Sequence, residues 1–157
     1  FALADEYNLD TRELSEREIT AELMSRVDEV PVAMALAQAA NESAWGTSRF
    51  AVEGNNIFGQ WCFEQGCGLV PLQRKGNASY EVRKFDSISA SVSAYIKNIN
   101  SQYSYEELRE LRARMRSRNE PLNAMDLAAG LAAYSERGED YVDEVRSLIV
   151  QNELDRL

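Results

Sequence analysis

The glycines of this chain are concentrated in one segment. Six of the eight lie between positions 46 and 76, and the chain on both sides has helical periodicity. Glycine destabilises helices and favours tight backbone turns. Short β-like stretches occur at 56–61 and 80–85. The sequence therefore predicts a predominantly helical α+β protein, one domain over residues 1–157, with a small β-lobe inserted between helical parts.

Helix signals flank this lobe on both sides. Ser15 and Glu18 have the spacing of a capping box, and Pro31 stands where a second helix would begin. The helical rhythm of that second helix continues to Ser43. Four more helices are predicted after the lobe: an apolar stripe over 88–99, a helix capped by Ser104 and Glu107, a helix over 122–132, and a helix that begins near Asp140.

The composition excludes several kinds of catalytic site. The chain has no histidine, which removes the usual base of Ser-His-Asp and Cys-His sites and the commonest zinc ligand. It has neither a dinucleotide-binding glycine motif nor a phosphate-binding loop motif. We therefore expect no cofactor and no metal, and any catalysis must use carboxylates, tyrosines, lysines or hydroxyls.

Charge and hydropathy limit the partners. A formal net charge of −9 argues against non-specific binding to nucleic acid or to an anionic membrane. No apolar run is long enough to span a membrane, and we expect a monomer. The arginines between positions 109 and 118 are interpreted as a solvated helix face. The chain starts at Phe1 without a signal peptide, which is interpreted as a mature form or an excised domain.

The two cysteines are spaced for a hairpin. Cys62 and Cys67 have four residues between them, and Gly66 and Gly68 supply turn freedom. This spacing can bring the two Cα atoms within disulfide range, and a disulfide would indicate an oxidising compartment such as the periplasm. The alternative is a pair of reduced thiols.

Glu42 is the first candidate for chemistry. It ends a helix rich in alanine and is flanked by Ala44 and Trp45. A carboxyl group that is partly desolvated there would have a raised pKa, as a general acid near neutral pH needs. The alternative, which periodicity alone favours, is a solvated surface glutamate.

The segments around Glu42 resemble a known family. The resemblance to glycoside hydrolase family 73, and within it to the Bax-type glucosaminidase branch, rests first on Ala37-Gln38-Ala39-Ala40-Asn41-Glu42-Ser43-Ala44-Trp45-Gly46-Thr47-Ser48-Arg49-Phe50 and on Gly54-Asn55-Asn56-Ile57-Phe58-Gly59. It continues in the family's order through Gly68 to Arg74, Tyr80 to Ser87 and Tyr134 to Tyr141.

The resemblance implies a lysozyme-like fold and a peptidoglycan hydrolase. The implied activity is that of an endo-β-N-acetylglucosaminidase, which cleaves the β-1,4 bond between N-acetylglucosamine and N-acetylmuramic acid. Glu42 matches the position of the family's general acid. The implied partner is the glycan strand of peptidoglycan, and the implied location is the periplasm or cell envelope of a bacterium. The alternatives are a lytic transglycosylase and a non-catalytic module that binds or assembles peptidoglycan.

The resemblance also implies supporting catalytic residues. Glycoside hydrolysis normally uses a second carboxylate. Glu81 is chosen for this role from its place in the motif order, with Glu53 and Glu64 as competitors. Alternatively, the N-acetyl group of the substrate acts as an internal nucleophile, and no second protein carboxylate is needed. A tyrosine of the late motif is expected to assist, with Tyr134 preferred to Tyr141.

Five further side chains are predicted to bind the sugar. Aromatic planes suit the apolar faces of sugar rings, so Trp45, Phe58 and Trp61 are candidates for stacking. Asn55 and Asn56 are candidates for hydrogen bonds to acetamido groups. The alternatives are that Trp45 packs in the core and that the two asparagines hold the turn after Gly54. Tyr141 is added to these as a residue that lines the site.

Overall fold

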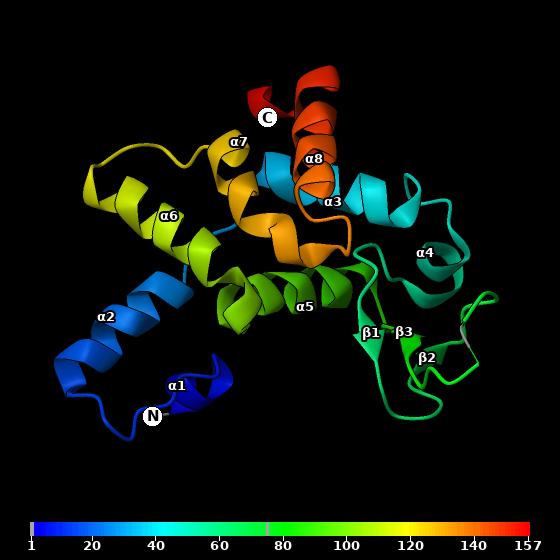
Figure 1. Ribbon diagram of the computed structural model, residues 1–157, viewed down its shortest axis with the longest axis horizontal. Coiled ribbons are helices and arrows are strands. Elements are labelled where there is room, and N and C mark those ends of the chain that lie inside the picture. Colours follow the sequence, from blue (N-terminus) through cyan, green and yellow to red (C-terminus); the bar gives the residue numbers. More distant parts are fainter. Residues whose placement is uncertain (1, 75) are drawn as a thin grey trace. The chain divides into compact units, whose positions relative to one another are not determined.

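The computed structural model describes residues 2–74 and 76–157 (Figure 1). The chain divides into two compact units, one made of Phe1–Ala37 with Ile96–Leu157 and the other of Gln38–Tyr95. The division falls within two helices, α3 (Val32–Ser43) and α5 (Ile88–Ser101). The fold is mainly helical with one small antiparallel sheet, so the predicted α+β class is confirmed.

The first unit is helical. Besides its parts of α3 and α5, it contains α1 (Ala2–Glu6), α2 (Glu16–Arg26), the 3₁₀ helix η1 (Tyr103–Tyr105), α6 (Glu106–Ser117), α7 (Ala124–Leu127), the 3₁₀ helix η2 (Ala128–Tyr134), α8 (Glu139–Gln151) and the 3₁₀ helix η3 (Leu154–Arg156). The helices α6, α7 and α8 pack around η2. Its apolar core is formed by fully buried side chains that include Leu108, Leu127, Leu131, Val142, Val145 and Ile149.

The second unit contains the β-lobe. The short helix α4 (Arg49–Gly54) is followed by β1 (Trp61–Cys62), β2 (Gly68–Leu69) and β3 (Glu81–Arg83). The strand order is β1-β3-β2, and both pairings are antiparallel. A Cβ atom at Gly68 would lie 2.0 Å from the carbonyl oxygen of Val82, so only glycine permits this approach of β2 to β3.

The helix predictions before the lobe are confirmed. Ser15 and Glu18 form a complete capping box at the start of α2. The helix α3 begins directly after Pro31 and ends at Ser43, as expected. No described helix is long and apolar enough to cross a membrane.

Two local predictions are wrong. Ser104 does not cap a helix, because it lies within η1, and Tyr105 precedes α6 without a side-chain capping bond. The predicted strand over 56–61 shrinks to its last residue, which pairs as the first residue of β1. Before it, the side chain of Asn56 bonds to backbone groups of its own loop and competes with strand pairing.

The interpretation of the arginine run as a solvated face is also wrong for two of its members. Arg109 and Arg112 are 5% and 1% exposed. The guanidinium of Arg112 donates to the carbonyl oxygens of Ser25 and Glu29 at 2.8 and 2.9 Å. It also donates to Asn100 Oδ1 at 2.8 Å. The reason is that α6 packs on α2, so one face of α6 is buried and its arginines bond to uncapped carbonyls.

Candidate active site

Glu42 lies in the last turn of α3 and is half-buried. The chain turns sharply after it, because Ala44 and Trp45 have φ angles of 51° and 58°. The hydroxyl of Ser43 donates to the carbonyl oxygen of Ala39 at 2.6 Å and accepts from Gly46 N at 2.7 Å. Left-handed backbone at two non-glycine residues is unfavourable and persists where the surroundings require it. The end of the helix is therefore fixed where it carries Glu42.

The backbone of Gly59 lies against the carboxyl group of Glu42. Gly59 has a φ of +68°, and a Cβ atom there would lie 2.9 Å from Glu42 Oε2. The loop that carries Gly59 is held by Asn56, which is 1% exposed. Asn56 Nδ2 donates to the carbonyl oxygens of Gln60 and Arg83 at 2.9 and 2.8 Å. This loop thus places a backbone without a side chain next to the candidate acid.

The side chains of Asn55, Asn56 and Phe58 all make contacts within the fold. Asn55 ends α4 in the left-handed conformation, and its Nδ2 donates to the carbonyl oxygen of Phe85 at 3.0 Å. Phe58 is 3% exposed and stacks on Tyr95 with ring centroids 3.8 Å apart. These contacts favour the turn-holding alternative for both asparagines and a core position for Phe58. Their roles in sugar binding stay predictions.

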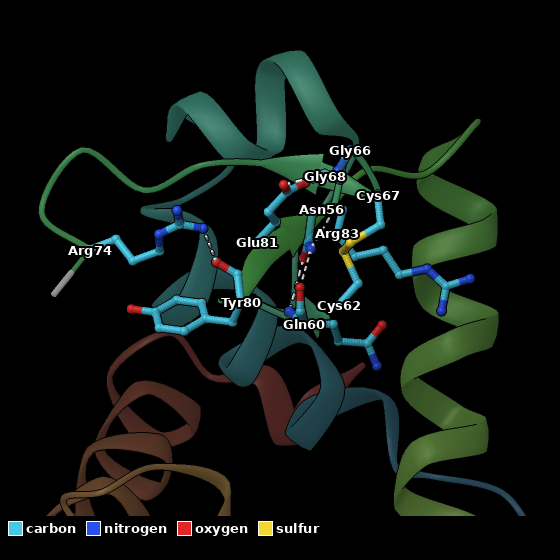
Figure 2. The surroundings of a disulfide bond; sticks show 10 residues. All are labelled: Asn56, Gln60, Cys62, Gly66, Cys67, Gly68, Arg74, Tyr80, Glu81 and Arg83. Atoms are coloured by element: carbon cyan, nitrogen blue, oxygen red, sulfur yellow. Dashed lines mark hydrogen bonds between the residues drawn. A yellow bond between two sulfur atoms is a disulfide. The ribbon is translucent and has the colours of Figure 1, made fainter. Parts of the chain in front are cut away.

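Cys62 and Cys67 form a disulfide, with Cα atoms 6.2 Å apart, so the predicted bond is confirmed. Figure 2 shows the Glu81 carboxylate beside this bond. The carboxylate is the third member of the one cluster of potential metal-binding side chains that the described residues contain. Because both sulfurs are in the disulfide, neither is a thiolate that could bind a metal.

The Glu81 carboxylate is held within the β-lobe. Glu81 is 5% exposed. Its Oε1 accepts from Gly66 N at 3.0 Å, and its Oε2 accepts from Gly68 N at 2.8 Å (Figure 2). The backbone N–H groups of Gly66 and Gly68 lower the pKa of the Glu81 carboxyl. Both oxygens thus stabilise the loop, and a carboxylate with a lowered pKa is a weaker base. The competitors Glu53 and Glu64 are exposed.

Both predicted tyrosines lie in the first unit. Tyr134 ends η2 and is half-buried, with its ring between those of Tyr105 and Tyr141. The rings of Tyr134 and Tyr141 are stacked, with centroids 5.5 Å apart. Tyr141 is fully buried. Tyr134 is therefore the member of the pair with access to solvent, as its preferred role requires.

The two tryptophans of the second unit are open to solvent. Trp45 is 64% exposed and Trp61 is 52% exposed. The ring of Trp61 stacks on the ring of Tyr80, with centroids 4.0 Å apart and planes inclined by 13°. The alternative that Trp45 packs in the core is therefore wrong, and both indole rings are accessible to a ligand.

Comparison with known proteins gives the family. The profile of the family described as mannosyl-glycoprotein endo-beta-N-acetylglucosaminidase matches residues 18–154. The chain belongs to this glucosaminidase family. It is 34% identical over 131 residues to protein Bax of Escherichia coli strain K12, a match that covers 83% of the chain and 46% of Bax. The chain thus spans about half the length of that relative. No solved structure matches it.

The second unit has a buried polar pair that the sequence analysis did not predict. The hydroxyl of Tyr95 donates to Gln38 Oε1 at 2.5 Å, and both residues are fully buried. Gln38 lies one turn before Glu42 on α3, so this pair fixes the face of the helix that carries the acid. The signal in the sequence was the spacing of four between Gln38 and Glu42. Tyr95 was hidden because it falls within the apolar stripe of α5.

Proposed function

We propose that this chain hydrolyses the β-1,4 bond between N-acetylglucosamine and N-acetylmuramic acid in bacterial peptidoglycan, with Glu42 as the general acid. The observation that carries the proposal is the position of Glu42. It stands at a fixed helix end, half-buried, with the Gly59 backbone against its carboxyl. Its surrounding motif lies within the segment that matches the glucosaminidase family. A carboxyl group held in this way suits protonation of a leaving sugar oxygen.

The substrate's own N-acetyl oxygen is the preferred internal nucleophile in this proposal. Both oxygens of Glu81 accept backbone hydrogen bonds, which opposes its use as a base or nucleophile. An N-acetyl sugar can supply the nucleophile from its amide oxygen. The hydroxyl of Tyr134 is assigned to orient this acetamido group or the attacking water.

The cell envelope, and in Gram-negative bacteria the periplasm, is the proposed location. The Cys62–Cys67 disulfide supports it, because disulfides persist in oxidising compartments. Peptidoglycan lies in the same compartment. The proposed partner is the glycan strand itself.

The experiment that tests the reaction is product analysis on purified sacculi. The proposal predicts soluble fragments that end in reducing N-acetylglucosamine. Fragments that end in 1,6-anhydromuramic acid would refute the hydrolase and indicate a lytic transglycosylase. Binding to sacculi without release of fragments would refute both enzymes and indicate a non-catalytic peptidoglycan-binding module.

A further inference from the structure

A stacked pair of aromatic rings lies on the β-lobe, formed by Trp61, which is exposed, and Tyr80, which is half-buried. Trp61 is 52% exposed although it lies in a strand, and its indole stacks nearly parallel on Tyr80. A large apolar side chain that stays open to water loses the stabilisation that burial would give it. The stack keeps one face of Trp61 covered and leaves the indole a flat, accessible aromatic surface.

The orientation of this pair is fixed from both sides. Trp61 pairs with Val82 in the sheet, and the next residue, Cys62, is held by the disulfide. Tyr80 directly precedes β3, and its carbonyl oxygen accepts from Arg74 Nη1 at 3.1 Å (Figure 2). The residue after Tyr80 is Glu81, whose carboxylate is tied to two backbone N–H groups. Rings held in this way need little ordering when a ligand binds.

We propose that the Trp61–Tyr80 pair is a sugar-binding platform that stacks on the pyranose ring of an N-acetylhexosamine in a β-1,4-linked glycan. The C–H groups on one face of such a ring form an apolar surface that fits an indole plane. β1 is an edge strand of the sheet, so a neighbouring strand does not cover its outer side. The identity of the sugar rests on the proposed function; the platform itself rests on the ring geometry.

The test is calorimetric titration of the full chain with the tetramer of N-acetylglucosamine, in a Glu42→Gln background that prevents turnover. Trp61→Ala and Tyr80→Ala are each expected to weaken binding about tenfold, the size of one lost ring stack. Tyr80→Phe keeps the ring and should change affinity less than about twofold. Phe63→Ala is the matched control, because Phe63 is 70% exposed in the same lobe and lies outside the stack.

The outcomes separate the platform from the proposed reaction. Unchanged affinity in Trp61→Ala and Tyr80→Ala, or no binding of the tetramer by the parent, would overturn the platform and leave sacculus hydrolysis unaffected. Weakened binding in these variants, from a chain that releases no fragments from sacculi, would support the platform and refute the proposed reaction. An equal loss in Phe63→Ala would also overturn the platform. Melting temperature and thiol titration of each variant establish that the lobe is folded.

Discussion

A missing side chain at position 59 defines the space in which the Glu42 carboxyl lies. Gly59 meets two requirements at once, since its backbone has a φ of +68° and a Cβ there would come within 2.9 Å of Glu42 Oε2. The clash would fall on the end of a flexible side chain, so the carboxyl group would move before the backbone did. An alanine at position 59 would therefore both strain the backbone of the loop and displace the candidate acid.

Replacing Gly59 with alanine should reduce catalysis through this displacement. A misplacement of about 1 Å can cost about 100-fold in rate, so kcat of Gly59→Ala is expected to fall by about that factor. KM should change little, because the side chains predicted to bind the sugar are unchanged. The measurement is steady-state hydrolysis of soluble peptidoglycan fragments. Gly66→Ala is the control, because Gly66 also has a positive φ, of +84°, and a Cβ there meets nothing within 4 Å. Full turnover by Gly59→Ala would contradict this account.

At the residue scale, the sequence predicts a candidate acid but not the contacts that hold it in place. Glu42 was found through its motif and its helix end. Asn56 was open to two interpretations because asparagine is favoured both in turns and in sugar sites. The turn-holding interpretation is favoured by the hydrogen bond from Asn56 to the carbonyl oxygen of Arg83, a residue 27 positions away. No local pattern reports such a contact, and the same holds for the Gln38–Tyr95 bond.

The β-lobe is an element that its strands alone would not stabilise. β1 and β2 have two residues each, and β3 has three. Sheets this small are marginal in water. The disulfide and the Glu81 carboxylate both hold the loop between β1 and β2. The lobe thus depends on one covalent bond and one buried anion.

The hydrogen bonds from Gly66 N and Gly68 N to the Glu81 carboxylate should make the thermal stability of the protein depend on pH. Because the native pKa of Glu81 is lowered, its contribution is fully present above its ordinary pKa of 4.5 and is lost as pH falls through the native value. Glu81→Gln should therefore melt at a lower temperature than the parent at pH 7, and the gap should narrow from about pH 5 downward. Melting curves across this range test it, with Glu64→Gln as the exposed control. A difference in melting temperature that is constant with pH would contradict a stabilising role for the ionised Glu81 carboxylate.

The disulfide should contribute a similar local restraint. Closing a loop with a sequence separation of 5 removes entropy from the unfolded chain. The expected loss in the free energy of unfolding for the double variant Cys62→Ser, Cys67→Ser is about 2 kcal/mol. Denaturant unfolding under oxidising conditions measures it. Parent protein treated with a thiol reductant should lose the same amount, and no loss in either sample would show that the bond is not a restraint.

At the element scale, periodicity predicted the long helices well and the short ones poorly. The bounds of α2, α3 and α5 follow from caps, Pro31 and apolar stripes. The region predicted as one helix over 122–132 is instead α7 followed by the 3₁₀ helix η2. That switch depends on packing of η2 among α6, α7 and α8, which tertiary contacts decide.

At the scale of the whole chain, the prediction that Arg112 lies on a solvated helix face is wrong. Its side chain is only 1% exposed, and it joins α6 to the end of α2, to the segment after α2 and to Asn100 of α5. Burial is the main cause of the lowered pKa of its guanidinium. The signal in the sequence was that Arg112 falls on the same helical stripe as Leu108 and Met115, which are buried. A count of charges alone concealed it.

Loss of Arg112 should be costly for the fold. Arg112→Met would leave buried carbonyl oxygens and the Asn100 amide oxygen without this donor. The expected loss in the free energy of unfolding is about 3–5 kcal/mol. Arg114→Met, on the exposed face of the same helix, should stay within about 0.5 kcal/mol of the parent. Urea unfolding of both variants measures the difference, and equal stabilities would refute a structural role for the buried arginine.

The family and the fold class were accessible from sequence because the motifs run through most of the chain in one order. The profile match over residues 18–154 confirms that order. The proposed reaction depends on the carboxyl group of Glu42, in a chain that has no histidine.

The most direct test of this central claim is the rate at which Glu42→Gln releases reducing ends from purified sacculi. The substitution keeps the size of the side chain and removes the transferable proton. Glu42→Gln is predicted to lose about 100-fold or more of the parent rate. Glu107→Gln changes an exposed glutamate of α6 that is not a candidate for the chemistry, and it should retain the parent rate. Release of reducing ends by Glu42→Gln at the parent rate would contradict the assignment of Glu42 as the general acid.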